Sequence, residues 1–144
     1  GIIWMEILFI VIAGKKEHKE ISAMAWTYEV STRKFYHNGT YEFTGLYAGA
    51  PGFKDDPQKE CVKDHGPLPR GSYTIGAPYT NHKTGKYSLN LEPHSTNNMC
   101  GRDLFRIHGD SQRNPGAASD GCIIAPLTAR KKIWASGDRE LIVK

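Results

Sequence analysis

From residue 24 onward, turn-forming residues recur too often to leave room for long helices. The chain of 144 residues contains 15 glycines and 8 prolines, and the segments between them are short and alternate apolar with polar side chains. Alternation with a period of two is typical of strands that bury one face. The sequence therefore predicts a mainly β domain, sandwich-like or barrel-like, with one or two short helices.

Individual segments place the expected elements. Trp26, Tyr28 and Val30 fall on one face of a strand at 25–30, and Asn38-Gly39 marks a tight turn within a hairpin. Residues 49–67 hold three prolines and three glycines, which indicates a loop. Strands are expected at 40–48, 71–76, 87–92, 104–109 and 139–144, with a short apolar run at 121–126.

One helix is expected near the C-terminal end, over residues 128–136. Thr128 is the candidate N-cap, and Gly137 follows the last turn, where glycine commonly ends a helix.

The first 23 residues differ in character from the rest. The run 2–13 is apolar except for Glu6, but it is shorter than the roughly 20 residues that cross a bilayer. The charged run 15–20 follows where a signal peptide would have a neutral cleavage region. We interpret 1–23 as an appended leader or extension and 24–144 as the domain. An uncleaved export segment is the alternative.

Charge and cysteine content narrow the function classes. The net charge of +4 suits an anionic partner, but the basic residues are scattered, so nucleic-acid binding is not expected. The three cysteines lack Cys-x-x-Cys spacing for zinc. In a protein that works outside the cytoplasm, Cys61 and Cys100 could pair and leave Cys122 free.

One histidine and one cysteine, each beside a glycine, are the strongest candidates for chemistry. His108 ends an apolar strand before Gly109, and Cys122 follows Gly121. A histidine beside a cysteine can remove its proton and create a thiolate nucleophile. The N–H groups of Gly121 and Cys122 are free of bulky side chains and could bind a developing oxyanion.

Other uses of the same residues remain open from spacing alone. Ser119 could bond to the loop or to the imidazole, and Asp110 could orient His108 or cap a turn. Cys122 could instead be a buried inert thiol. A zinc site is a further alternative, built from residues His108, Asp110 and Cys122 with His94 or His65.

Longer motifs favour the cysteine–histidine interpretation. The segments "IHGD" (107–110) and "ASDGCIIAP" (118–126) follow "WTY" (26–28), "GPLPRGSYTIG" (66–76) and "NNMCGR" (97–102). In this order and spacing the chain resembles the YkuD-type L,D-transpeptidases, and within them the small type VI secretion L,D-transpeptidase effectors. The resemblance covers most of 24–144 and implies a single YkuD-like catalytic domain.

The resemblance also implies a function. In such enzymes Cys122 would attack a peptidoglycan stem tetrapeptide and His108 would transfer the proton, giving L,D-carboxypeptidase or D-amino-acid exchange activity without a metal or other cofactor. An effector of this kind would be a monomer that the type VI secretion apparatus delivers into the periplasm of a competing bacterium. A cognate immunity protein would neutralise it in the producer.

Two positions depart from the broader transpeptidase pattern. Asp120 stands where many of these enzymes have histidine, and Ile124 stands where they have asparagine or arginine. The substrate-carboxylate contact must then come from elsewhere. The candidates for substrate binding are Asp120, Arg102, Arg106, His65 and Tyr73, each of which could also be an ordinary surface or core residue. A housekeeping cross-linking transpeptidase, a silent wall-binding module and a zinc amidase are the alternative functions.

Overall fold

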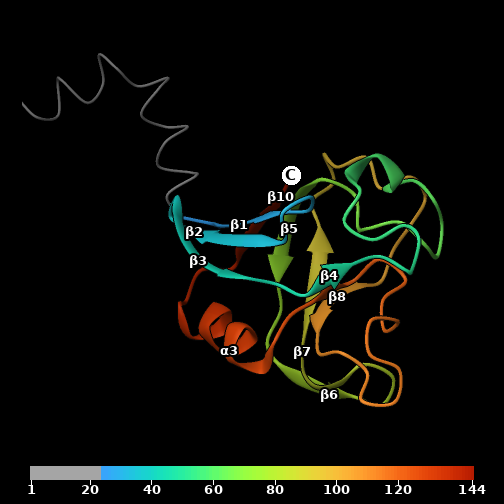
Figure 1. Cartoon of the computed structure of the whole chain (residues 1–144). Coiled ribbons are helices and arrows are strands. Elements are labelled where there is room, and N and C mark those ends of the chain that lie inside the picture. The colour runs from blue at the N-terminus through green and yellow to red at the C-terminus, as the bar shows by residue number, and fades with distance from the viewer. Residues whose placement is uncertain (1–23) are drawn as a thin grey trace, which may run out of the picture.

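The computed structural model describes residues 24–144, so the interpretation of 1–23 lies outside the described residues (Figure 1). A mixed ten-stranded sheet makes up most of this part, with one α-helix and one short 3-10 helix. In chain order the elements are β1 (Trp26–Glu29), β2 (Lys34–His37), β3 (Thr40–Thr44), β4 (Tyr47–Ala48), η1 (Pro57–Lys59), β5 (Gly71–Ile75), β6 (Tyr79–Asn81), β7 (Gly85–Pro93), β8 (Phe105–His108), β9 (Ile123–Ile124), α3 (Leu127–Ala135) and β10 (Glu140–Val143).

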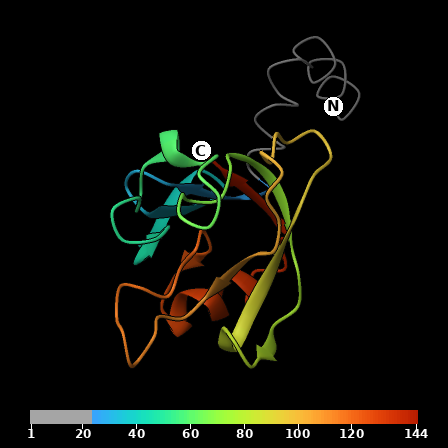
Figure 2. The ribbon, with the colours of Figure 1, turned by 90° about the vertical axis from the view of Figure 1, so that its right-hand side faces the viewer.

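The strand order is β3-β2-β1-β10-β5-β7-β8-β9-β4, and β6 pairs separately with β7. Two pairs are parallel, β1 with β10 and β8 with β9, and the other pairs are antiparallel. Figure 2 shows β7, the longest strand, running along the height of the molecule. The mainly β prediction is confirmed, while β6 and η1 were not expected.

The segment predicted as one strand at 40–48 is two strands with a corner at Gly45 and Leu46. The Gly45 N–H donates to Arg33 O (2.6 Å), on the β2 side, and the Leu46 N–H donates to Ile124 O (2.8 Å), on the β9 side. A Cβ on Gly45 would lie 3.1 Å from the Phe35 ring. This bent segment therefore connects the two ends of the strand order, which gives the sheet its barrel-like closure.

The core lies inside the curved sheet and under α3. Trp26, Tyr28 and Val30 all belong to it, as the alternation at 25–30 predicted. Phe105 and Ile107 of β8 point into the same core, so their neighbours Arg106 and His108 lie on the other face of the strand. Alternation along β8 thus separates the residues that hold the fold from those available for chemistry.

The prediction of Thr128 as N-cap is wrong. The helix begins one residue earlier, at Leu127, with Pro126 at the N-cap position and no side-chain cap bond. Proline fixes its own backbone and ends β9's extended segment, so the chain enters the helix directly after it. The helix end agrees with the sequence, because Gly137 adopts a positive φ of 80° just beyond the Ser136 C-cap.

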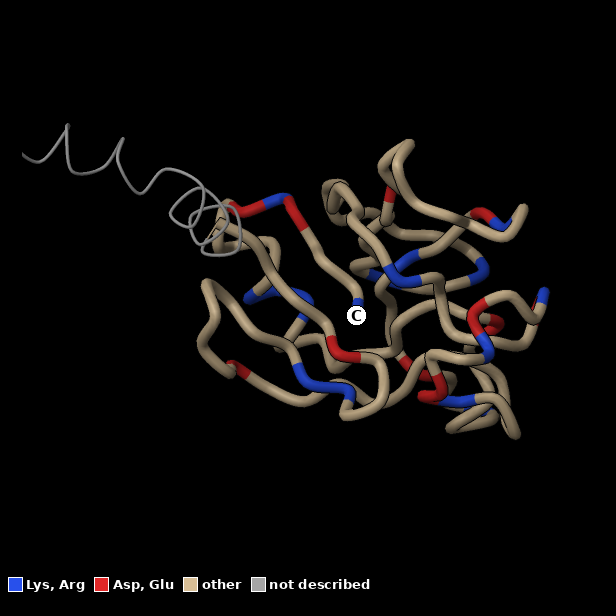
Figure 3. The backbone as a smooth tube through the Cα atoms, turned by 90° about the horizontal axis from the view of Figure 1, so that it is seen from above, with Lys and Arg blue, Asp and Glu red and all other residues tan. Residues whose placement is uncertain are grey.

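Charged residues of both signs are interspersed around the described chain, without a continuous basic face (Figure 3). Within residues 24–144, no helix has the length and apolar content needed to span a membrane.

Candidate active site

A cleft of about 870 Å³ opens on the face of β8 away from the core. Both His108 and Cys122 line it. In Figure 1 the β6–β7 turn and the loop before β9 lie together at the lower right, on this side of the molecule. The segments that supply the walls are 63–64, 82–85, 101–106, 108–111, 117–118 and 120–122.

His108 is the last residue of β8 and is only 4% exposed. Its Nδ1 lies 2.8 Å from the Gly109 carbonyl oxygen. Because a carbonyl can only accept, Nδ1 must carry the proton, and in the neutral ring Nε2 then bears the lone pair. The Gly109 backbone thus supplies the group that orients His108 and fixes it in the tautomer that can act as a base.

Cys122 is a free thiol that stands directly before β9. The parallel register pairs Ile107 with Ile123 and His108 with Ile124. Extended by one residue, this register sets Cys122 beside Arg106, on the same face as His108. The spacing of the two residues predicts a loop that brings their side chains within hydrogen-bond reach. Both line the cleft, but no hydrogen bond joins them, and the Cys122 thiol instead contacts the Leu104 carbonyl oxygen at 3.9 Å.

The resting pair is uncharged. Burial lowers the pKa of His108, and the nearby guanidinium groups of Arg130 and Arg106 lower it further. Burial also raises the pKa of the Cys122 thiol, although the N–H and guanidinium of Arg106 act in the opposite direction. These directions correspond to a protonated thiol and a neutral imidazole in the cleft at neutral pH.

Gly121 cannot be replaced by a residue with a side chain without strain. Its φ is +147°, and a Cβ there would lie 2.7 Å from Arg102 Nη2, 2.8 Å from the Phe105 ring and 2.9 Å from the Gly66 carbonyl oxygen. This close packing fixes the backbone that carries Cys122.

Ser119 stabilises the loop before β9 that carries Cys122. Its buried hydroxyl accepts hydrogen bonds from the N–H of Gly49 (2.9 Å) and of Gly121 (3.0 Å), and donates one to the Cys122 carbonyl (2.7 Å). The Gly121 N–H is therefore not the free oxyanion donor that the sequence suggested. Among the loop backbone hydrogen bonds of residues 24–144, none uses the Cys122 N–H.

Asp110 caps the loop after β8 and makes no bond to His108. Its carboxylate accepts hydrogen bonds from the Tyr47 hydroxyl (2.6 Å) and from the N–H groups of Ser111 and Gly116 (2.8 and 3.2 Å). Partial burial acts to raise the pKa of Asp110, but these donors together hold it below the usual range. Burial and the bond to Asp110 raise the pKa of Tyr47 to about 12.

Arg102 is buried and binds backbone rather than facing solvent. Its two terminal nitrogens donate to the carbonyl oxygens of Glu60, Gly66, Pro67 and Asp120 at 2.5 to 3.0 Å. Burial lowers its pKa. Four of its five N–H donors are engaged in this way, so Arg102 connects the loop that carries Cys122 to the 60–67 loop.

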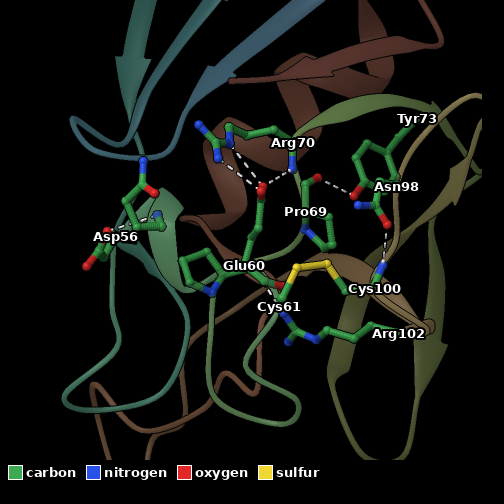
Figure 4. Close-up of polar contacts among 11 residues, drawn as sticks. Asp56, Glu60, Cys61, Pro69, Arg70, Tyr73, Asn98, Cys100 and Arg102 are labelled. Carbon is green, nitrogen blue, oxygen red and sulfur yellow. Dashed lines mark hydrogen bonds and ion pairs between the residues drawn. A yellow bond between two sulfur atoms is a disulfide. The ribbon is translucent and has the colours of Figure 1, made fainter.

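A disulfide joins the same loop to the segment that carries Arg102. Cys61 and Cys100 are bonded, with their Cα atoms 5.3 Å apart, and Cys122 is left free (Figure 4). Figure 4 also shows Glu60 receiving the Arg70 guanidinium (2.9 Å), which orders the loop further. The pairing that the sequence left open is present.

Of the other residues predicted to bind substrate, two line the cleft and two lie elsewhere. Arg106 lines the cleft, and so does the exposed Asp120. Tyr73 is fully buried, and its hydroxyl donates to the Pro69 carbonyl, so it belongs to the core. His65 is exposed outside the cleft lining, where its ring packs on Phe53 at 5.0 Å.

Arg130 packs beside the site and was not among the residues predicted from the sequence. It projects from α3, and its guanidinium donates to the carbonyls of Ala125 (3.0 Å), Lys86 (2.8 Å) and Tyr87 (3.1 Å). A Cβ on Gly109 would lie 2.7 Å from its Nη2, so it packs behind the histidine. Its position in the basic run 130–132 gave it the pattern of a solvated surface charge.

Within residues 24–144, no three side chains of His, Cys, Asp or Glu come together in a way that could hold a metal ion. His108, Asp110 and Cys122 line the same cleft but do not form such a group. Asp110 is taken up by its loop, and His94 lies beside Glu140 (3.3 Å), outside the cleft lining.

With this geometry established, comparison with known proteins identifies the family. The model of the Tlde1 domain matches residues 42–140, more than half of the chain. The chain belongs to the Tlde1 family. This is the family of type VI secretion L,D-transpeptidase effectors, as the motifs at 66–76, 97–102 and 107–126 indicated.

No curated protein matches the chain. Among solved structures, it is similar to L,D-transpeptidase 1 of Mycobacterium tuberculosis, with 15% identity, a TM-score of 0.46 and coverage of 83% of this chain and 60% of that one. The corresponding values are 15%, 0.42, 83% and 58% for an L,D-transpeptidase from Mycobacterium smegmatis, and 13%, 0.40, 83% and 59% for one from Xylanimonas cellulosilytica. This Tlde1 chain thus spans about 60% of the length of the transpeptidases it matches.

Proposed function

We propose that this protein is an antibacterial type VI secretion effector that cleaves peptidoglycan stem tetrapeptides through a thioacyl-enzyme on Cys122. The observation that carries the proposal is the placement of His108, at the end of β8, and Cys122, directly before the parallel strand β9, in the lining of one cleft. Membership of the Tlde1 family supports the substrate class and the route of delivery.

The first half of the reaction transfers the acyl group to the enzyme. The Cys122 Sγ attacks the carbonyl carbon that precedes the terminal D-alanine, while His108 Nε2 takes the thiol proton. The Cys122 N–H donates to the oxyanion of the tetrahedral intermediate. When the C–N bond breaks, His108 gives its proton to the departing amine, which leaves a thioester on Cys122 and a neutral imidazole.

The second half returns the thiol. A water molecule attacks the thioester carbon while His108 takes its proton, the C–S bond breaks, and His108 returns the proton to sulfur, which gives a tripeptide, the Cys122 thiol and a neutral imidazole. If the amine of a free D-amino acid attacks in place of water, the product is an exchanged tetrapeptide. Hydrolysis removes the tetrapeptide and exchange changes its last residue, so both reactions consume the stem that ends in D-alanine, and we propose that this makes the protein toxic.

Two features support action outside the cytoplasm. The Cys61–Cys100 disulfide suits an oxidising compartment such as the periplasm. The net charge of +4 favours approach to an anionic wall polymer. We further propose that a cognate immunity protein protects the producing cell, as expected for a toxin of this family.

Mass spectrometry of muropeptides tests the proposal. Tetrapeptide-rich peptidoglycan is incubated with the protein, with and without added D-amino acids, beside the Cys122→Ala variant. We expect tripeptides in the first case, exchanged tetrapeptides in the second, and neither with the variant. An unchanged profile from folded wild-type protein would contradict the enzyme and leave a wall-binding module as the better description.

A further inference from the structure

Arg106 presents a charged side chain to the cleft at the nucleophile itself. It alternates with the core residues Phe105 and Ile107, so it shares the open face of β8 with His108. The parallel register pairs Ile107 with Ile123, and its extension by one residue sets Arg106 beside Cys122. Its charge acts on both reacting groups, because it lowers the pKa of His108 and of the Cys122 thiol.

The guanidinium of Arg106 is held on one side only. Its Nε donates to the Tyr79 hydroxyl (2.7 Å), which in turn donates to the Asn90 side-chain oxygen (2.6 Å). Tyr79 comes from β6 and Asn90 from β7, so two neighbouring strands fix the plane of the group. In the part of the chain that the structure describes, the two terminal nitrogens make no hydrogen bond or ion pair with protein.

Arg106 differs from the other lysine and arginine side chains that line the cleft, because it is both held in place and left with N–H donors that bind no protein group. Both terminal nitrogens of Arg102 already donate to backbone carbonyl oxygens. Lys63 and Lys83 also line the cleft, but a lysine offers a single mobile point charge where arginine offers a planar fork. Ile124, at the position where many transpeptidases carry a polar residue, is fully buried.

We propose that Arg106 binds the terminal carboxylate of the stem peptide and thereby restricts cleavage to the last peptide bond. The proposal rests on the function proposed above. With Nε tied to Tyr79, the two terminal nitrogens can hold a carboxylate end-on through two charge-assisted hydrogen bonds. A bond one residue from the chain end has such a carboxylate next to it, whereas an internal or C-terminally amidated bond does not.

Kinetics with a matched pair of substrates test this role. The substrates are a stem tetrapeptide with a free terminal carboxylate and the same peptide with a C-terminal amide. For the wild type we expect kcat/KM to be about 100-fold higher for the acid, the factor typical of one charge-assisted pair. Loss of the Arg106 charge affects the Cys122 thiol equally with both substrates, so the acid-to-amide ratio isolates carboxylate binding.

In Arg106→Gln this ratio should fall toward one. Arg106→Lys should keep an intermediate ratio, because it retains charge without the fork, and it serves as the second variant if the glutamine variant does not fold. Tyr79→Phe should lower the ratio by freeing the guanidinium. Arg113→Gln, which removes an exposed arginine outside the cleft lining, should leave the ratio as in the wild type.

Three results would overturn the proposal, and they differ in meaning. Equal rates on acid and amide in the wild type, or a full ratio in folded Arg106→Gln, would remove Arg106 from carboxylate binding while leaving the thioacyl mechanism intact. Absence of Cys122 acylation by either substrate would remove the proposed function and this proposal with it.

Discussion

At the scale of single residues, the protonation of His108 and Cys122 decides how the site works. Many activated cysteines are held as thiolates by a neighbouring imidazolium. Here burial pushes the two pKa values the other way, down for His108 and up for the Cys122 thiol. The mechanism proposed for Cys122 therefore requires that its thiolate be generated by proton transfer once substrate is bound.

This assignment predicts two pH profiles. Protonated His108 cannot act as a base. Because its pKa is lowered, kcat/KM should begin to fall only below the usual histidine pKa of about 6.5. Iodoacetamide alkylation of Cys122 in the resting enzyme should be slow at pH 6 and rise steadily with pH, since the thiol stays protonated. Rapid alkylation at pH 6, followed by intact-protein mass spectrometry, would instead indicate a preformed thiolate.

Gly121 gives a second prediction at this scale. Gly121→Ala adds a Cβ that meets Arg102, Phe105 and the Gly66 carbonyl at under 3 Å. We expect the free energy of unfolding in urea to fall by about 2–4 kcal/mol, from overpacking and backbone strain together, with loss of activity. Gly52→Ala is the matched control, because Gly52 has a positive φ of 87° and open space around it. Its cost should be about 1 kcal/mol. Equal losses in both variants would show that packing against Gly121 does not matter.

At the scale of elements, the segment 97–102 connects three parts of the molecule. Asn97 exchanges hydrogen bonds with the backbone of Ser72 in β5 (2.9 and 2.8 Å). Cys100 forms a disulfide with Cys61, and Arg102 donates a hydrogen bond to the Asp120 carbonyl, in the loop that carries Cys122. A short irregular segment thus connects the sheet, the 60–67 loop and the loop that carries Cys122.

The disulfide should contribute measurably to stability. The two cysteines are 39 residues apart, and closing a loop of this size in the unfolded chain is worth about 2–4 kcal/mol. We expect the Cys61→Ser/Cys100→Ser double variant to lose that amount in urea unfolding, and dithiothreitol to produce the same loss in the wild type. Cys122→Ala should unfold like the wild type and respond to the reductant in the same way. A wild type indifferent to reductant would show that the bond does not support the fold.

At the scale of the whole molecule, the sequence predicted what depends on local pattern. Alternation marked most strands, as in 25–30, and the glycines beside His108 and Cys122 marked the site. Contacts between distant segments could not be predicted in this way. The closure at Gly45, the binding of Arg102 to four carbonyls and the packing of Arg130 behind His108 depend on which strands become neighbours. A buried arginine has the same sequence pattern as an exposed one until the partners are known.

The boundary of the domain follows from this long-range pairing. The family match begins at residue 42, yet β1 lies between β2 and β10 in the interior of the strand order. Its end is tied to the C-terminus, because the Val30 N–H donates to Lys144 O (2.8 Å) and the Lys144 N–H donates to Tyr28 O (3.0 Å). Residues before 42 therefore belong to the fold.

Two shortened chains test where the fold begins. We expect residues 24–144 to unfold in urea in one cooperative transition, with the same midpoint as the full chain and the same activity on tetrapeptides. Residues 42–144 should not fold, because they lack Trp26, Tyr28, Val30 and Phe35 from the core and leave β10 without a parallel partner. Each large side chain lost from a core costs about 2–5 kcal/mol, which together exceeds the stability of a typical domain. A folded 42–144 chain would show that β1 and β2 are accessory strands. A lower midpoint for 24–144 than for the full chain would show that the first 23 residues contribute to the domain.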